Sequence, residues 1–274
     1  MSFRPLAAIS LCAIALAGCS EGVLAPHGPI AGAERQILFN ALAIMLAIVV
    51  PTILATLGVA GWFRASNKRA KFMPWFFYSG RLELLVWSIP AMTVILVGGV
   101  AWVGAHDLDP AKPLASETKP IRIQVVSLDW KWLFIFPDEG VASVNELEIP
   151  TGVPVRFELT SSGVMNSFFV PQLAGQIYTM SGMVTHLELQ ADNAGTYPGF
   201  SAQYSGGGFS DMRFQLDAVS PEQFTKWLER TRGTGPTLDA HAYEELTRPS
   251  KNVPPSTYGS VTPDLFNIVA RAQQ

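Results

Sequence analysis

Two long stretches without a charged residue constrain this chain more than any other feature of its sequence. Residues 37–63 make one stretch of 27 residues, and residues 84–105 make a second of 22. Because an α-helix rises about 1.5 Å per residue, both are long enough to cross a bilayer core of about 30 Å. Charged residues are 15% of the chain, below the share of about 25% in ordinary globular proteins. The sequence therefore predicts transmembrane helices over residues 37–63 and 84–105.

The loop between the two predicted helices, residues 64–83, is rich in positive charge. Against one acidic residue, Glu83, it carries Arg64, Lys68, Arg69, Lys71 and Arg81. Short loops rich in Lys and Arg stay in the cytoplasm. We therefore expect this loop inside the cell, and both residues 19–36 and the chain from residue 106 onward outside it.

Residues 1–18 have the pattern of a secretory signal peptide, with Arg4 before a short apolar run over residues 6–17. Residues 16–19, Leu-Ala-Gly-Cys, resemble the lipobox of bacterial lipoproteins. That resemblance implies cleavage before Cys19 and attachment of a lipid to its sulfur. The alternative is an ordinary signal peptide with an incidental cysteine. Lipidation agrees with the loop charge in predicting a multi-pass protein of a bacterial inner membrane, with its N-terminus and C-terminal portion on the periplasmic side.

The remaining composition excludes several kinds of function. The two cysteines, Cys12 and Cys19, both lie near the N-terminus, and no two of the four histidines stand at the spacing of a metal site. A thiol catalyst or a thiolate metal cluster is therefore not expected in the body of the protein. The net charge of −3 provides no basic surface for nucleic acid.

A different pattern begins after a polar, proline-containing linker, residues 106–120. From residue 121 to residue 219, short stretches alternate apolar and polar side chains, as in residues 121–125 and 155–159. Turn sequences rich in Gly, Pro, Asn and Asp separate these stretches. Short strands at such spacing predict a β-sandwich or barrel of about 100 residues.

The last segment, residues 220–274, is predicted to be a tail with short helices. Ser220, Pro221 and Gln223 combine a helix N-cap, a helix-start proline and a capping-box residue, so a helix should run through Trp227 to Arg230. A second short helix is expected from about Pro263. The predicted fold class is mixed: a two-helix transmembrane hairpin, a periplasmic all-β sandwich, and short C-terminal helices.

This arrangement resembles subunit II of the haem–copper respiratory oxidases, whose outer domain is a cupredoxin. Members that take electrons from cytochrome c hold a dinuclear copper centre, Cu-A, through an H-S-x-x-x-P segment and a C-x-E-x-C-x-x-x-H-x-x-M loop. Residues 166–171 and 201–212 match these segments. The ligand positions hold Asn166, Ser201, Gln203, Ser205, Phe209 and Met212. Only the methionine is of the ligand type, and copper in such sites needs thiolates and imidazoles, so no metal is expected here.

A subunit II without copper ligands resembles that of the quinol oxidases, most closely the cytochrome bo type. The stretches that carry this resemblance are residues 129–132, 164–169, 176–178 and 204–206. The resemblance implies a non-catalytic, structural subunit of a proton-pumping ubiquinol oxidase, a respiratory complex that reduces oxygen to water. It implies that this chain holds no cofactor and that ubiquinol is the substrate of the complex. It also implies haems and copper in a catalytic subunit I, with further small membrane subunits and membrane lipids as partners.

The resemblance also gives a role to Glu83, at the start of the second predicted transmembrane helix. In the family, a glutamate at the matching position lies at the cytoplasmic mouth of a proton-uptake path, the K-channel, in the catalytic subunit. A carboxylate there can collect protons from the cytoplasm. The alternative interpretation is a juxtamembrane charge that only marks the end of the helix.

Two other functions compete with this interpretation. The first is a stand-alone, membrane-anchored lipoprotein that uses its β-domain to bind a ligand or to assist assembly. The second is a copper-bearing cytochrome c oxidase subunit, which the ligand positions disfavour. Restoring that centre would need at least five substitutions: Asn166→His, Ser201→Cys, Gln203→Glu, Ser205→Cys and Phe209→His.

Overall fold

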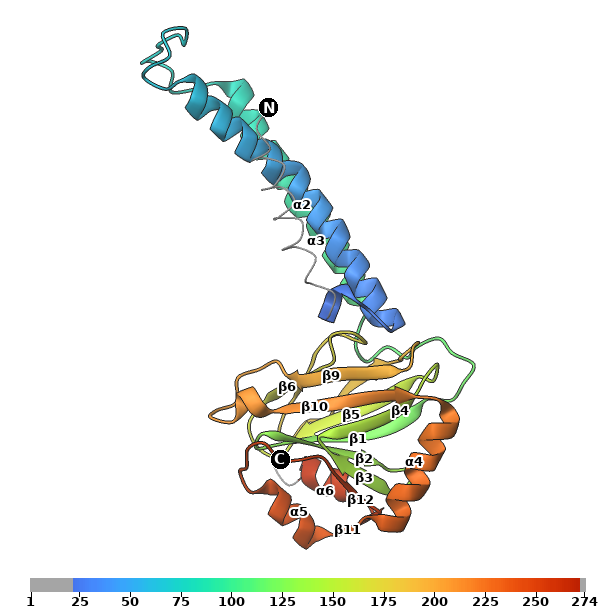
Figure 1. Ribbon diagram of the computed structural model, residues 1–274. Helices are drawn as coiled ribbons and strands as arrows, with labels where there is room; N and C mark the ends of the chain where they lie inside the picture. Colours follow the sequence, from blue (N-terminus) through green and yellow to red (C-terminus); the bar gives the residue numbers. More distant parts are fainter. Residues whose placement is uncertain (1–21, 272–274) are drawn as a thin grey trace, which may run out of the picture. The chain divides into compact units, whose positions relative to one another are not determined.

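A computed structural model describes residues 22–271 of the chain (Figure 1). These residues form two compact units: residues 34–108 make one, and residues 22–33 with residues 109–271 make the other. The predicted signal peptide and the predicted lipid attachment at Cys19 lie outside the described residues.

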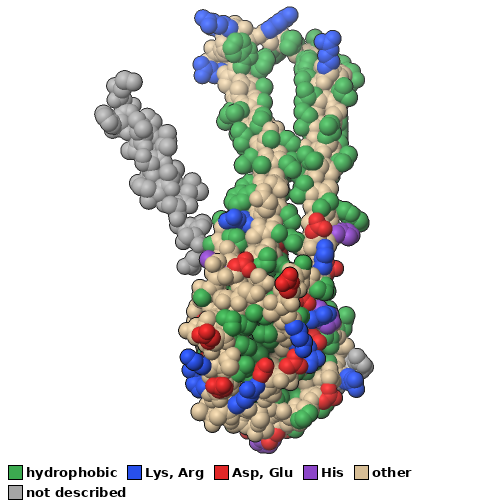
Figure 2. All heavy atoms as spheres, turned by 90° about the vertical axis from the view of Figure 1, so that its right-hand side faces the viewer, with side chains coloured by type: hydrophobic (Ala, Val, Ile, Leu, Met, Phe, Trp, Pro, Cys, Tyr) green, Lys and Arg blue, Asp and Glu red, His purple; other side chains and the backbone are tan. Residues whose placement is uncertain are grey.

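The helical unit consists of two long helices and the loop between them. Helix α2 (Pro29–Trp62) has 34 residues and helix α3 (Gly80–Asp107) has 28, and both are long and apolar enough to cross a membrane. Both begin before the predicted ranges 37–63 and 84–105, because polar residues beside an apolar stretch continue the same backbone hydrogen bonds. Figure 2 shows apolar side chains along these helices and Lys and Arg side chains gathered at their loop end.

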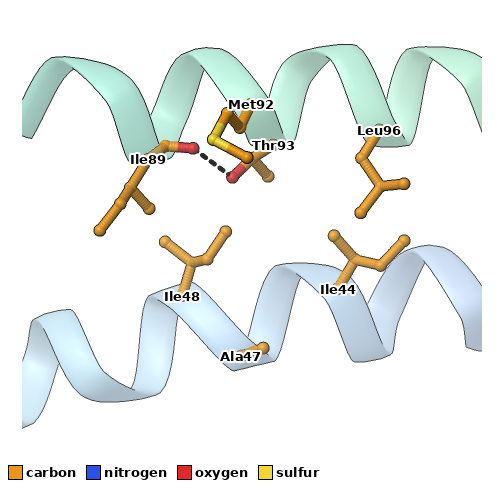
Figure 3. Close-up of a pocket in the computed structure, with 7 residues that line it drawn as sticks. All are labelled: Ile44, Ala47, Ile48, Ile89, Met92, Thr93 and Leu96. Atoms are coloured by element: carbon orange, nitrogen blue, oxygen red, sulfur yellow. Dashed lines mark hydrogen bonds between the residues drawn. The ribbon is translucent and has the colours of Figure 1, made fainter. Parts of the chain in front are cut away.

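An apolar pocket of about 460 Å³ separates α2 and α3 near their middle (Figure 3). Its lining is Ile44, Ala47, Ile48, Ile89, Met92, Thr93 and Leu96. The Thr93 hydroxyl donates to the Ile89 carbonyl at 2.7 Å, which satisfies this polar group within its own helix. The helices approach more closely at Gly104, where an added Cβ would lie 2.6 Å from Cδ1 of Ile37.

The second unit is built on two sheets, as the alternating pattern predicts. The six-stranded sheet, in the order β12-β3-β2-β1-β5-β8, contains β1 (Ile121–Leu128), β2 (Lys131–Phe136), β3 (Val141–Val144), β5 (Val155–Ser161), β8 (Thr185–Leu189) and β12 (Ser256–Tyr258). The five-stranded sheet, in the order β4-β10-β9-β6-β7, contains β4 (Glu146–Pro150), β6 (Asn166–Phe169), β7 (Ile177–Thr179), β9 (Gly195–Ser201) and β10 (Arg213–Val219). Strands β1 and β5 are parallel, as are β4 and β10.

Aromatic side chains from both sheets meet in the main core. Phe168 on β6 is completely buried, and its ring stacks on that of Phe214 with the centroids 5.0 Å apart. The Trp132 and Phe157 rings of the other sheet both lie 5.4 Å from Phe168. Contacts between aromatic rings stabilise a fold beyond the burial of their surface, so this cluster holds the two sheets together.

The C-terminal segment differs from the predicted helical tail, because it also contributes strands. Its elements are α4 (Pro221–Thr234), β11 (Thr237–Leu238), α5 (Ala240–Thr247), β12, β13 (Ser260–Val261) and α6 (Leu265–Arg271). The predicted capping box at Ser220 and the helix near Pro263 are both confirmed. Strand β12 extends the six-stranded sheet by pairing with β3. Helix α6 belongs to a second core on that sheet, where Leu265 and Phe266 are buried with Leu133 and Ile135.

Two buried polar side chains fasten this tail to the sheet. The Lys131 ammonium donates to the Arg248 carbonyl at 2.8 Å. The Asn145 carboxamide accepts from the backbone N–H of Trp132 at 2.8 Å and donates to the Val253 carbonyl at 2.9 Å. Burial lowers the pKa of Lys131, while nearby Asp129 opposes this change. The tail is thus an integral part of the β-unit.

The segment before α2 also packs on the β-unit, which the sequence did not suggest. It begins with the 3-10 helix η1 (Gly22–Leu24). The N–H of His27 donates to the Gln172 carbonyl at 2.7 Å, and the His27 carbonyl accepts from the Asp192 N–H at 2.8 Å. An added Cβ at Gly28 would lie 2.2 Å from the Gln190 carbonyl oxygen. This close approach of two backbones requires glycine.

Candidate functional site

The fold brings together the two segments that match the copper-binding motifs. Strands β6 and β9 pair so that Phe168 lies opposite Ser201. Asn166 and Ser201 are both buried, and the Ser201 hydroxyl lies 3.0 Å from Oδ1 of Asn166. The same hydroxyl accepts a hydrogen bond from the Ser167 N–H at 3.5 Å. Ser201 and Asn166 therefore form a hydrogen bond with one another at the positions where the motif has cysteine and histidine.

The other four positions lie in the segment that follows β9. The Gln203 carbonyl oxygen is 3.2 Å from the Ser201 hydroxyl. The Ser205 hydroxyl oxygen is buried and has no hydrogen-bond partner among residues 22–271. Phe209 opens the 3-10 helix η2 (Phe209–Asp211), and its ring packs edge-on against Tyr204. The Met212 side chain is fully buried in the main core.

This set of side chains does not fit a dinuclear copper centre. Copper sites of this kind require deprotonated thiolates and neutral imidazoles. A serine hydroxyl is a hard, protonated donor, and the ring of Phe209 has no lone pair to offer. The Met212 thioether is a weak donor and is committed to core packing. These six positions, called here the copper-like frame, lie on segments that the pairing of β6 with β9 brings together, but they lack the ligand chemistry of the motif.

The side chain of Trp130 packs against the loop over residues 205–208, which the motif comparison did not reveal. Its indole N–H donates to the Ser205 carbonyl at 3.0 Å. An added Cβ at Gly208 would lie 2.3 Å from Cδ2 of the same indole. The run of glycines at residues 206–208 is the sequence signal for this close approach. Trp132 is buried in the main core, and Trp130 packs against that core.

The chain is similar to proteins of one family along most of its length. It is 46% identical over 94% of its residues to the cytochrome bo(3) ubiquinol oxidase subunit 2 of Pseudomonas aeruginosa, and covers 78% of that protein. It is 43% identical over 94% of its residues to the ubiquinol oxidase subunit 2 of Acetobacter aceti, and covers 84% of that protein. The chain belongs to the family of ubiquinol oxidase subunit 2.

Two further comparisons concern parts of the chain. Residues 232–271 match the COX Aromatic Rich Motif family. This match covers the tail segment from the end of α4 through α6. The periplasmic domain of subunit II of cytochrome oxidase from Bradyrhizobium japonicum is 20% identical, with a TM-score of 0.40, and the match covers 43% of this chain and 96% of that domain.

In this member of the ubiquinol oxidase subunit 2 family, Glu83 lies in the first turn of α3. Its backbone N–H donates to the Ser79 carbonyl at 2.9 Å, which starts the helix. Its carboxylate oxygen Oε2 accepts from the indole N–H of Trp87, one turn further along, at 3.3 Å. Both side chains line an open pocket of about 360 Å³ together with Phe76, Phe77, Tyr78, Ser79, Leu82 and Val86. Trp87 was not singled out from the sequence, although its spacing of four residues from Glu83 is a helical signal.

The carboxyl group of Glu148, whose pKa is raised, belongs to the β-unit but lies away from the copper-like frame. Burial raises the pKa of Glu148 on β4 to about 7, and the charges of Glu146 and Asp217 act in the same direction. The guanidinium of Arg230 on α4, 3.9 Å away, opposes this change. The contact with Arg230 places Glu148 where α4 meets the five-stranded sheet. Glu148 is not part of the loop around Trp130.

Proposed function

We propose that this chain serves as the non-catalytic, structural subunit 2 of a membrane-bound ubiquinol oxidase complex, in which electrons pass from quinol to oxygen. One observation carries the proposal: Ser201 and Asn166 hydrogen-bond to one another where a copper-bearing subunit has ligands. An oxidase that takes electrons from quinol within the membrane needs no copper relay in this domain. On this proposal the haems, the copper and the quinol site belong to the catalytic subunit and to other membrane partners.

The topology proposed for the complex follows from the charge of the chain. The loop between α2 and α3 lies in the cytoplasm, because its basic residues favour that side. The β-unit then lies in the periplasm, and a lipid on Cys19 would add an anchor on that same side. Two membrane-spanning helices hold a chain far more firmly than acyl groups do. The lipid is therefore an accessory anchor in this proposal.

The electron donor gives the first test of this function. The complex is purified through a tag on this chain, and its oxygen uptake is measured with a short-chain ubiquinol and then with reduced cytochrome c. We expect uptake with the quinol only, because the residues of the copper-like frame provide no electron entry from outside the membrane. Uptake with cytochrome c would contradict the proposal. Purification of the chain without any oxidase would favour the stand-alone lipoprotein instead.

We also propose that Glu83 takes up protons from the cytoplasm for the complex. Its position supports this role, because it is an acidic residue in the first turn of a transmembrane-length helix and lines an open pocket. A carboxylate at such a place can accept a proton from water and release it again. Kinetics distinguish this role from that of a simple boundary charge.

Replacing Glu83 with glutamine tests that role, because it keeps the shape of the side chain and removes its titration. We expect about tenfold slower oxygen uptake at pH 8 and a smaller loss at pH 6, where protons are more abundant. Haem content per subunit measures assembly, which should not change. Glu117→Gln, in the segment between α3 and β1, is the matched control. Wild-type rates at every pH would assign Glu83 to the boundary role.

A further inference from the structure

Trp87 donates a hydrogen bond to the Glu83 side chain. Its indole nitrogen lies 3.3 Å from Oε2 of the carboxylate, and four residues separate the two along α3. Most other side chains around this pair are apolar or aromatic, including Leu82 and Val86 on the same helix and Phe76 and Phe77 in the loop before it. An indole has one N–H and no acceptor, so it can only donate to the carboxylate.

A carboxylate at this place has considerable conformational freedom when no partner holds it. Glutamate has three rotatable side-chain bonds, and fixing such a side chain loses entropy. Proton transfer requires hydrogen-bond contact between donor and acceptor, directly or through one water. A donor that holds Oε2 restricts the carboxylate, and the side chain still lines the open pocket, where its other oxygen can meet water. The planar ring of Trp87 is well suited to this, because it is rigid beyond its own two torsions.

We infer that Trp87 is a positioning residue for proton uptake, which holds the Glu83 carboxylate by one oxygen so that the other exchanges protons with water. This inference rests on the proton role proposed for Glu83. The proton that Oε1 accepts from water leaves again from that oxygen, and the indole N–H keeps its own proton throughout. Trp87 thus contributes orientation and no chemistry.

The competing account of Trp87 is an aromatic anchor at the membrane interface, where tryptophan is common. The two accounts differ in whether the effect of losing Trp87 depends on the residue at position 83. An anchor stabilises the helix whatever residue stands at position 83, and its loss slows the complex equally at all pH values. A positioning residue acts through the carboxylate, so its loss has no further effect once Glu83 is glutamine.

The test is a double-mutant cycle on the purified complex, with oxygen uptake measured from pH 6 to pH 8.5 and normalised to haem content. The single variants are Trp87→Phe, which keeps a ring and removes the donor, and Glu83→Gln. The third arm combines both substitutions. Trp87→Gln is the rescue variant, because its amide again places an N–H donor one turn from Glu83. Trp75→Phe is the control, since Trp75 is another exposed indole, in the preceding loop.

We expect Trp87→Phe to slow oxygen uptake about threefold at high pH and less at low pH, since an exposed hydrogen bond to a charged group contributes modestly. Trp87→Gln should regain most of that loss, and Trp75→Phe should match the wild type. In the Glu83→Gln background, Trp87→Phe should change nothing. If Trp87→Phe prevents assembly, Trp87→Leu, which also removes the donor, replaces it in both the wild-type and the Glu83→Gln backgrounds.

The outcomes separate the two proposals. A Glu83→Gln complex with wild-type rates overturns the proton role of Glu83, and the inference about Trp87 with it. A slow Glu83→Gln complex beside a normal Trp87→Phe complex overturns the positioning inference alone. An equal loss from Trp87→Phe in both backgrounds assigns Trp87 to anchoring.

Discussion

Replacing Phe168 with alanine is expected to lower the free energy of unfolding of the β-unit by about 3–5 kcal/mol, as is typical of a fully buried phenylalanine. The ring has no exposed surface, and it touches Trp132 and Phe157 of one sheet and Phe214 of its own. Removing it leaves a cavity between the sheets that the rigid aromatic neighbours cannot close. A loss of this size is a large fraction of the 5–15 kcal/mol that stabilises a typical domain.

The measurement uses the full-length chain in its membrane, incubated in a urea series, with a brief protease pulse and detection of the intact β-unit. Phe169→Ala is the matched control, because Phe169 is the next residue on β6 and is only half-buried, against Phe200. The urea midpoint should fall steeply for Phe168→Ala and slightly for Phe169→Ala. Equal shifts for the two variants would mean that Phe168 is not central to the core.

Replacing Gly259 with alanine is expected to destabilise the tail by about 2–3 kcal/mol, as overpacking against rigid atoms does. An added Cβ would lie 2.7 Å from the Gly235 carbonyl oxygen and 2.9 Å from those of Thr231 and Arg232. All three atoms belong to the backbone at the end of α4, so no side-chain rotation can relieve the contact. The turn between β12 and β13 would have to move away from α4. The packing of residues 232–271, the segment that matches the COX Aromatic Rich Motif family, would loosen with it.

Protease cleavage of the tail without urea measures this loosening, because a detached segment is cut faster than a packed one. Gly233→Ala is the matched control: it lies in α4, and an added Cβ there would meet nothing within 4 Å. Alanine in a helix is more stable than glycine by up to about 1 kcal/mol, so the control should resist cleavage as well as the wild type or better. A stable Gly259→Ala tail would contradict the close packing at this turn.

The parts of the fold that could be predicted from the sequence depend on local patterns. The apolar stretches at residues 37–63 and 84–105 predict helices because a bilayer core has a fixed thickness. The capping box at Ser220 predicts the start of α4, since its hydrogen bonds close within one turn. The lost copper ligands are equally local, because ligand type at a motif position decides which metal can bind. Asn166 and Ser201 could be assigned to one site only through the family motif.

The parts that could not be predicted depend on contacts between distant segments. Leu133 and Ile135 alternate with Trp132 and Phe134 on β2, yet both sets are buried. Alternation identifies the two faces of a strand but does not show that a tail more than 100 residues later covers the second face. The strands β11 to β13 escaped prediction for the same reason, since segments of two or three residues acquire strand geometry only from a partner.

The sequence by itself determined the class of this protein: two membrane-length helices, a β-domain, and a copper-binding frame whose ligands are replaced. The helices and the β-domain follow from composition and periodicity, which act within a few residues of each position, and the frame follows from the resemblance to the family motif. The tertiary structure alone decided that Lys131 and Asn145 hold the tail, that Trp130 shapes the loop over residues 205–208, and that Trp87 meets the Glu83 carboxylate. Those contacts depend on the direction of individual side chains and on strand register, which packing of the whole chain determines.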